Sequence, residues 1–284
     1  MTHLDKKIAV VTAITGGYDC LHKQMPNIEG IDYYCITDSD IKETNGWKII
    51  NDYKFPDYMN AKFKSFEIRY KLLSIFNNYD YVIWQDASIE LNDNFIEIID
   101  DFIKKDYDFS VVMYGHRITY DFHLKMIEYT FGVAKDHHHM TFENDQITRW
   151  LKNKNWDLGV NSTINAALRI HKNNEKCKWF NQVIFNELVY LNQIYINDPT
   201  KYGQMWHNFY YDELVTTYYT TLLNKNFKIY LMPISIYNSE YTIKYAHNSL
   251  TRPCGDYDIF YNRADVAMEN VYFNNMICKN SICI

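Results

Sequence analysis

The residue of this sequence best placed to do chemistry is an aspartate at the end of a strongly apolar segment. The segment Tyr81-Val82-Ile83-Trp84-Gln85 is typical of a buried strand, and Asp86 follows it directly. In open α/β sheets, ligands bind where the strands end. Asp86 either caps the turn after the strand or contacts a metal ion or a ribose, and the uniformly buried character of the strand favours the contact.

A metal ion at this position would find few ligands in the same segment. An Asp-x-Asp pair can bind a divalent cation that neutralises a diphosphate, but here the sequence is Asp86-Ala87-Ser88, with Glu90 beyond it. We therefore expect Asp86 and Ser88 to bind the ion together with His247 from a later loop. An imidazole ligand suits Mn²⁺ better than Mg²⁺, so Mn²⁺ is the expected ion. A histidine on a loop can equally have a structural role alone.

Further charged residues are candidates for contacting a bound anion or an acceptor. His116 and Arg117 follow another apolar strand, and Arg252 lies shortly after His247 in the chain. Each is a candidate phosphate contact, although His116-Arg117 can equally form an ordinary surface salt bridge. Asp212-Glu213 begin a predicted helix, where carboxylates are favourable for structural reasons and where a base for an acceptor hydroxyl can also stand.

The elements that must position these residues alternate between strands and helices. Apolar runs predict strands at residues 7–14, 32–37, 47–50, 81–86, 109–114, 162–170 and 228–233. Helical periodicity predicts helices at residues 59–76, 94–105, 120–129, 145–152, 176–191 and 212–224, with Arg69 and Lys71 among the polar positions of the first. This alternation is typical of an α/β fold with a mostly parallel sheet flanked by helices. Irregular structure is expected after residue 233.

Composition excludes several other classes of protein. The chain has 284 residues, enough for one domain with a C-terminal appendage, and its net charge of -6 argues against nucleic acid as a partner. No apolar run is long enough to span a membrane, and no signal peptide is recognisable at the N-terminus. The six cysteines lack metal-binding spacing, so reduced thiols and a cytoplasmic location are expected.

Three segments, in this order, resemble a glycosyltransferase-like family long catalogued as a domain of unknown function. They are the strand and loop ending in Gly16-Gly17-Tyr18-Asp19, the strand ending in Thr37-Asp38, and the strand ending in Trp84-Gln85-Asp86. The resemblance extends from about Ala9 to Leu223 and includes Lys71, His116, Arg117, Leu168-Arg169-Ile170-His171, Trp179 and Asp212.

The resemblance implies a GT-A type fold, which is a Rossmann-like α/β sheet that binds a nucleoside-diphosphate sugar, usually with a divalent cation. Residues 1–235 would form this domain, with a donor half at about 1–115 and an acceptor half at about 116–235. Residues 236–284 would form a C-terminal extension that closes over the donor site. The expected activity is transfer of a sugar, from a UDP-sugar, to a hydroxyl of a glycan or glycoconjugate.

The resemblance also implies roles for single residues. Thr12, Ala13 and Tyr18 would lie along the nucleoside, Asp38 near the base or ribose, and Asp86 at the metal and ribose. Lys71, His116 and Arg117 are further donor contacts within the resemblance. Ser88 and Arg252, which are named from their positions in the chain, complete the expected donor contacts. Asp212 or Glu213 would be the base of an inverting enzyme, whereas a retaining enzyme could work without one.

Two alternatives remain. One is a noncatalytic nucleotide- or carbohydrate-binding protein of the same fold. The other is a sugar nucleotidyltransferase, which usually has a Gly- and Arg-rich N-terminal loop. Here the loop Thr15-Gly16-Gly17-Tyr18 has no arginine.

Overall fold

The computed structural model describes residues 2–17, 21, 28–42, 44–57, 59, 61–113, 150, 153–154, 164–191, 211–237 and 239–244. Its main sheet contains β1 (Ile8–Ile14), β2 (Ile31–Thr37), β3 (Lys48–Ile50), β4 (Tyr81–Gln85), β6 (Phe109–Met113), β7 (Ile164–Asn165), β8 (Leu168–Lys172) and β9 (Ile229–Pro233). The α-helices are α1 (Ala61–Ile75), α2 (Phe95–Lys104), α5 (Glu175–Leu191) and α7 (Tyr211–Leu223). Short elements are η1 (His3–Asp5), η3 (Asn224–Asn226), η4 (Ile234–Ile236), β5 (Ile89–Leu91) and β10 (Thr242–Lys244).

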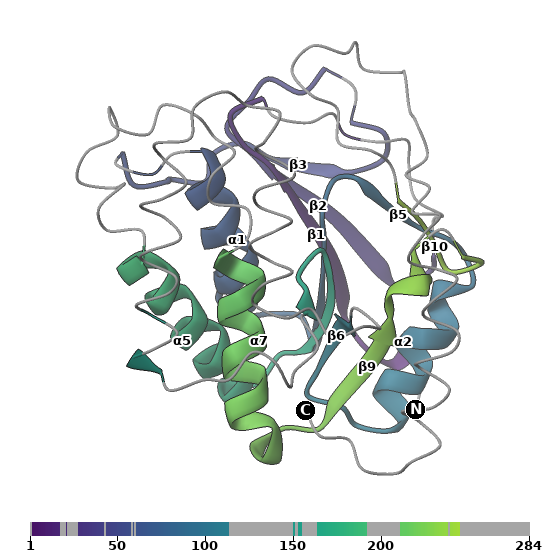
Figure 1. The fold of residues 1–284 in the computed structure, drawn as a ribbon. Coiled ribbons are helices and arrows are strands. Elements are labelled where there is room, and N and C mark those ends of the chain that lie inside the picture. Colours follow the sequence, from purple (N-terminus) through teal and green to yellow (C-terminus); the bar gives the residue numbers. More distant parts are fainter. Residues whose placement is uncertain are drawn as a thin grey trace.

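The main sheet is mixed and mostly parallel. Its strand order is β3-β2-β1-β4-β8-β6-β7, and β9 pairs with β6. Strands β1 to β4 are mutually parallel, β6 pairs in parallel with β9, and β8 runs antiparallel between β4 and β6. Figure 1 shows these strands side by side in the middle of the molecule. The α/β class with a mostly parallel sheet is therefore confirmed.

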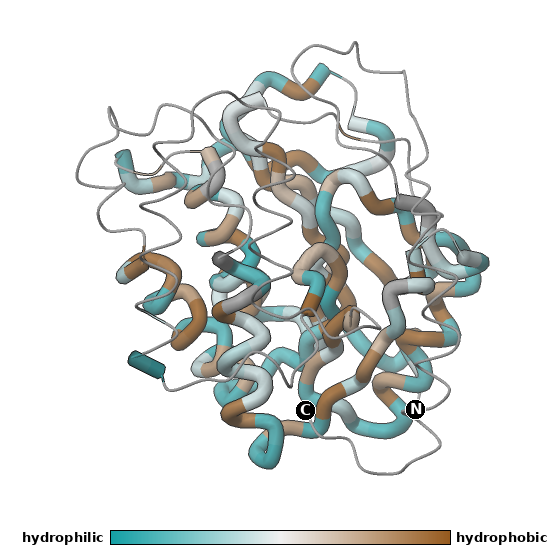
Figure 2. Tube along the Cα trace, viewed as in Figure 1, coloured by the Kyte–Doolittle hydropathy of each residue, from teal (hydrophilic) through white to brown (hydrophobic). Residues whose placement is uncertain are grey.

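Helices cover both faces of this sheet. On one face, α1 packs against α5, and α5 against α7, while α2 lies on the other face (Figure 1). Successive residues of a strand point to opposite faces, so Ala9 and Val11 of β1 join the α1 side and Val10 joins the α2 side. Burial on both sides explains the continuous apolar runs, and Figure 2 shows hydrophobic residues concentrated along the strands.

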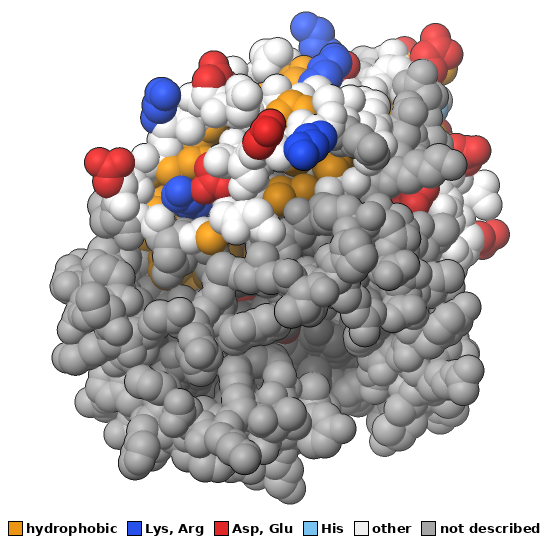
Figure 3. Space-filling view, turned by 90° about the horizontal axis from the view of Figure 1, so that it is seen from above, with side chains coloured by type: hydrophobic (Ala, Val, Ile, Leu, Met, Phe, Trp, Pro, Cys, Tyr) orange, Lys and Arg blue, Asp and Glu red, His pale blue; other side chains and the backbone are white. Residues whose placement is uncertain are grey.

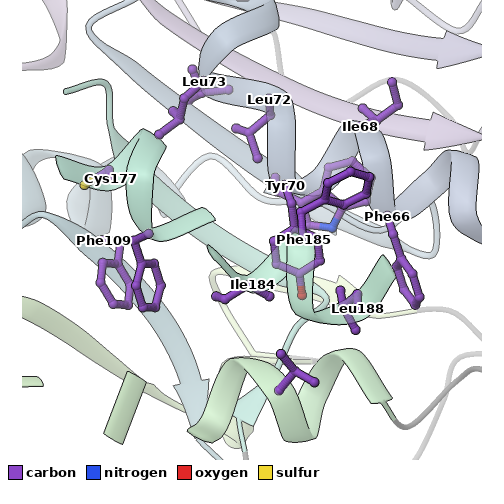
Figure 4. Close-up of a cluster of buried hydrophobic side chains, with 14 of the residues drawn as sticks. Phe66, Ile68, Tyr70, Leu72, Leu73, Phe109, Cys177, Ile184, Phe185 and Leu188 are labelled. Atoms are coloured by element: carbon purple, nitrogen blue, oxygen red, sulfur yellow. The ribbon is translucent and has the colours of Figure 1, made fainter. Parts of the chain in front are cut away.

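Aromatic and aliphatic side chains fill the layer between the sheet and helices α1 and α5. Figure 4 shows Phe66, Tyr70 and Leu72 of α1 together with Ile184 and Phe185 of α5. All five are at most 5% exposed. This packing fixes α1 against the sheet, and α1 carries the arginine of the candidate site.

The order in which the strands are added to the sheet reverses at β1, which creates a natural ligand position. β1 is flanked by β2 on one side and by β4 on the other, so the connections that leave β1 and enter β4 lie on opposite sides of it. Ligands of open α/β sheets bind at such switch points, at the carboxyl ends of the strands. The loop at Gly16 and the residue Asp86 both follow the carboxyl ends of these two strands.

Two expectations about the second half of the chain need correction. The single strand expected at residues 162–170 is two strands, because Asn165 Oδ1 accepts the amide of Ala167 at 3.0 Å and the hydroxyl of Tyr237 at 2.8 Å. This local turn interrupts the strand without reversing it, because β7 and β8 both pair antiparallel with β6. Residues after Pro233 are not wholly irregular, since η4 follows and β10 pairs antiparallel with β5. The helix expected at residues 120–129 lies outside the described residues.

No helix in the described part of the chain is long and apolar enough to cross a membrane.

Candidate functional site

Asp86 is held by backbone contacts at the carboxyl edge of the sheet. The β1–β4 register pairs Val11 with Trp84, so Asp86 lies level with Ala13, two residues further along. The amide of Asp86 donates to the carbonyl of Ala167 at 2.8 Å, and its carbonyl accepts the amide of Ile89 at 2.9 Å. These contacts fix the start of the turn that follows β4, as the sequence predicted.

Arg69 joins Asp86 to Asp212. Its Nη2 donates to Asp86 Oδ1 at 2.6 Å, and its Nη1 donates to Asp212 Oδ2. The two carboxylates are 17 and 143 residues away from the arginine along the chain. The side chains are 6% exposed for Arg69, 21% for Asp86 and 3% for Asp212. Asp86 is thus the member of this bridge that a ligand could reach most easily.

Trp84 completes the bridge from the sheet. Its Nε1 donates to Asp86 Oδ1 at 3.0 Å, and its ring lies 4.9 Å from Arg69 Cζ. Burial alone would lower the pKa of Arg69, but Asp86 and Asp212 outweigh it, and the pKa is raised. Arg69 therefore remains a cation at all physiological pH values.

The site has an excess of negative charge among its described residues. Glu213 follows Asp212, is 7% exposed and acts on the charge of Arg69. Asp86, Asp212 and Glu213 all act on the guanidinium of Arg69, and Arg169 lies on the neighbouring strand β8. A diphosphate would be repelled by this balance unless further positive charge accompanied it.

A divalent cation fits this chemistry in part. The hydroxyl of Ser88 is fully buried, and its Oγ has no hydrogen-bond partner in the described ranges, so Asp86 and Ser88 offer two oxygen ligands. The described residues contain no cluster of three metal-ligating side chains. A cation held by one carboxylate and a substrate phosphate is ordinary for Mg²⁺-type sites. His247, the expected third ligand, lies outside the described residues.

A second group of contacts ties the loop after β1 to the loop after β2. Gly16 donates its amide to Asp38 Oδ1 at 2.7 Å, Gly17 donates to Ser39 Oγ at 2.9 Å, and Lys64 of α1 donates to Asp38 Oδ2 at 2.7 Å. Burial alone would raise the pKa of Asp38, but Lys64 and the Gly16 amide lower it. Asp38 is therefore an ionised carboxylate that shapes the Gly16-Gly17 loop.

We expect Gly16→Ala to destabilise the protein more than Gly17→Ala. Both glycines have a positive φ, +66° and +63°, which costs an alanine about 1 kcal/mol. A Cβ on Gly16 would lie 2.6 Å from Ala61 Cβ, whereas the nearest described atom to a Cβ on Gly17 would be Ser39 Oγ at 4.0 Å. Urea unfolding should show an additional loss of about 1–3 kcal/mol for Gly16→Ala. Equal losses would mean that the loop does not pack on α1 in this way.

The remaining expected residues divide into three sets: two residues of β1, one residue of α1, and a set outside the described residues. Ala13 lies on the same face of the sheet as Asp86, while Thr12, which is fully buried, points to the α2 face because strand residues alternate. Lys71 binds Glu67 at 2.6 Å and lies about 200° around α1 from Arg69, away from the bridge. A third set lies outside the described residues: Tyr18, His116, Arg117, His247 and Arg252.

Sequence reasoning placed Arg69 on the polar side of its helix, and this was wrong. Arg69 is 5% exposed, because Phe66, Leu72 and Leu73, three and four residues away, form the buried stripe of α1. A charged residue three and four positions away from the apolar residues of a helix is the signal that could have revealed the burial of Arg69. Arg169, inside an apolar strand, carried the same signal.

No family model matches this chain, and no curated protein sequence matches it significantly. The fold and the site therefore define a class only: an α/β protein with a mixed, mostly parallel sheet and a buried Asp86–Arg69–Asp212 bridge at its carboxyl edge.

Proposed function

We propose that this protein is a glycosyltransferase that moves a sugar from a nucleoside-diphosphate sugar, preferably a UDP-sugar, to a hydroxyl of a glycan or glycoconjugate. One observation carries the proposal. Arg69 joins a carboxylate that follows a central parallel strand to a carboxylate at the start of α7, at the switch point of the sheet. Buried, charged groups brought together from distant segments are typical of functional sites.

The residues of the bridge and their neighbours would each have a part in this reaction. Asp86 would accept hydrogen bonds from donor hydroxyls and, with Ser88, would hold a divalent cation, for which Mn²⁺ is the expected choice. Such a cation, when bound, supplies positive charge to the departing nucleoside diphosphate. Arg69 would bind both carboxylates and hold each in a fixed orientation. Asp212 or Glu213 would receive the proton of the acceptor hydroxyl in an inverting reaction.

The surface charge does not favour nucleic acid as a partner. Figure 3 shows acidic and basic side chains interspersed over the described part of the face seen from above. The net charge of the chain is -6. Binding to nucleic acid relies on a basic patch, which neither observation supports.

Thermal unfolding with a panel of nucleoside diphosphates and nucleotide-sugars tests the donor site. A ligand that binds only the folded state stabilises it by about 2.7 kcal/mol at a concentration 100-fold above its Kd. We expect a Mn²⁺-dependent rise in the unfolding midpoint with UDP or one UDP-sugar, which Asp86→Ala abolishes. Asp106→Asn, which alters an ion pair of the exposed surface, is the matched control and should keep the rise. An equal rise in Asp86→Ala would refute the donor site.

A noncatalytic binding protein is the second candidate. The observation in its favour is that Arg69 already engages both Asp86 and Asp212, and a buried ion-pair network can be purely structural. This candidate requires nucleotide or sugar binding without turnover.

A further inference from the structure

A second buried layer of polar contacts lies beneath the Arg69–Asp212 bridge. Arg169 of β8 donates from Nη2 to Tyr70 Oη at 2.9 Å and to Thr216 Oγ1 at 3.4 Å. Tyr70 Oη and Thr216 Oγ1 are themselves 2.9 Å apart. All three residues are at most 2% exposed. We call these three residues the lower layer.

The lower layer connects the same elements as the bridge above it. Tyr70 follows Arg69 on α1, and Thr216 lies one helical turn after Asp212 on α7. Arg169 is paired with Trp84 in the β4–β8 register, and Trp84 donates to Asp86. A shift of Arg169 would therefore move both helices and the indole that supports the site.

The charge of Arg169 is not needed to fill this space. Its hydrogen-bond partners in the described ranges are two hydroxyl groups, it lies 5.0 Å from the Tyr70 ring, and no described carboxylate forms an ion pair with it. Burying a guanidinium without a carboxylate costs more free energy than burying an apolar side chain of similar size. The hydrogen bonds to Tyr70 and Thr216 offset part of this cost.

Arg169 and a carboxylate of the site act on the same buried group. Burial is the main cause of the raised pKa of Tyr70, and both Arg169 and Asp212 act on the same phenol. Arg169 and Asp212 thus share one buried neighbourhood, where charges interact over longer distances than in water. Arg169 is the second positive charge beside the carboxylates of Asp86, Asp212 and Glu213.

We propose that Arg169 is a positioning residue for the site. Through Tyr70 and Thr216 it fixes the relative placement of α1 and α7, the helices that carry Arg69 and Asp212 of the bridge. The kinetic part of this proposal rests on the proposed glycosyltransferase function. The structural part does not.

The test uses Tyr70→Phe, Arg169→Met and Arg169→Lys in the full chain, with Thr220→Val as the control. Thr220 lies one turn after Thr216 on α7, is 1% exposed, and its Oγ1 has no partner among the described residues. Tyr70→Phe removes one hydroxyl and keeps the ring, so it remains informative if Arg169→Met fails to fold.

Two measurements are made on each folded variant. The first is kcat and KM for release of UDP from the UDP-sugar that the parent uses. The second is the indole N–H resonance of Trp84, assigned with Trp84→Phe. We expect Tyr70→Phe and Arg169→Met to lower kcat by about 10- to 100-fold with little change in KM, and to shift the Trp84 resonance. Arg169→Lys keeps the charge and should recover part of both, and Thr220→Val should change neither.

The outcomes separate the two proposals. A parent-like kcat, or an unmoved Trp84 resonance, in folded Tyr70→Phe would overturn the positioning role. If the parent releases UDP from no donor, the proposed function fails. The Trp84 resonance then decides the positioning role alone, because a shift supports it and an unmoved resonance overturns it.

Discussion

Replacing Arg69 by methionine is expected to lower the free energy of unfolding by about 3–5 kcal/mol. The substitution removes the cation that pairs with Asp86 and Asp212, and the Asp212 side chain is only 3% exposed. A buried carboxylate without a partner has lost its hydration and has no ion pair or hydrogen bond to replace it. Urea unfolding of the parent and of the Arg69→Met variant measures the difference.

A matched variant separates this effect from the loss of any surface ion pair. Lys172 pairs with Asp106 at 2.6 Å, with side chains 33% and 70% exposed. Exposed pairs contribute about 0–1 kcal/mol, so Lys172→Met should be nearly neutral. If Arg69→Met also cost less than about 1 kcal/mol, the bridge would not exist in the folded protein.

His171 is expected to make the protein sensitive to mild acid. It is 1% exposed, stacks on Phe109 with ring centroids 6.2 Å apart, and has no hydrogen-bond partner for either ring nitrogen among the described residues. Burial, and to a lesser extent Arg169, lowers the pKa of His171 from 6.5 to about 3. The imidazole is therefore neutral in the folded protein over the whole range in which a solvated histidine takes up a proton.

The direction of the pH effect follows from which state binds the proton. Between pH 6.5 and about 3, the unfolded chain holds a proton on His171 that the folded protein does not. This contribution to stability is present above pH 6.5 and is lost as the pH falls, with a slope of up to about 1.4 kcal/mol per pH unit.

Urea unfolding between about pH 4 and about pH 7 measures this slope. His171→Phe should reduce the slope relative to the parent. Parallel pH profiles for the parent and His171→Phe would show that His171 is not buried as a neutral group.

The sequence predicted the first half of the fold well because each element there carries its own local signal. The strand at Tyr81–Gln85 and the helix at Phe95–Lys104 agree with the expected ranges to within one residue at each end. Their apolar runs and periodic stripes are local properties of the chain. The position of Asp86 was predicted for the same reason, because the end of an apolar run is also a local signal.

The sequence did not reveal the direction of β8 or the partners of Asp212. β8 pairs antiparallel with β4 and with β6, and the direction of a strand depends on long-range pairing that no local pattern predicts. The partner of Asp212 comes from a helix 143 residues earlier, and only tertiary packing brings them together. Asp212 was named from its place at the start of a predicted helix and from the resemblance, while Arg69, which connects it to Asp86, was assigned to the wrong side of its helix.

Release of nucleoside diphosphate from a panel of nucleotide-sugars, with and without Mn²⁺, tests most directly whether the Asp86–Arg69–Asp212 bridge is a sugar-transfer site. We predict turnover of one UDP-sugar by the parent and by the surface control Asp106→Asn. In Asp86→Asn the same turnover should fall by about 100-fold or more. Binding of nucleotide without turnover by the parent, or equal turnover in Asp86→Asn, would contradict this account.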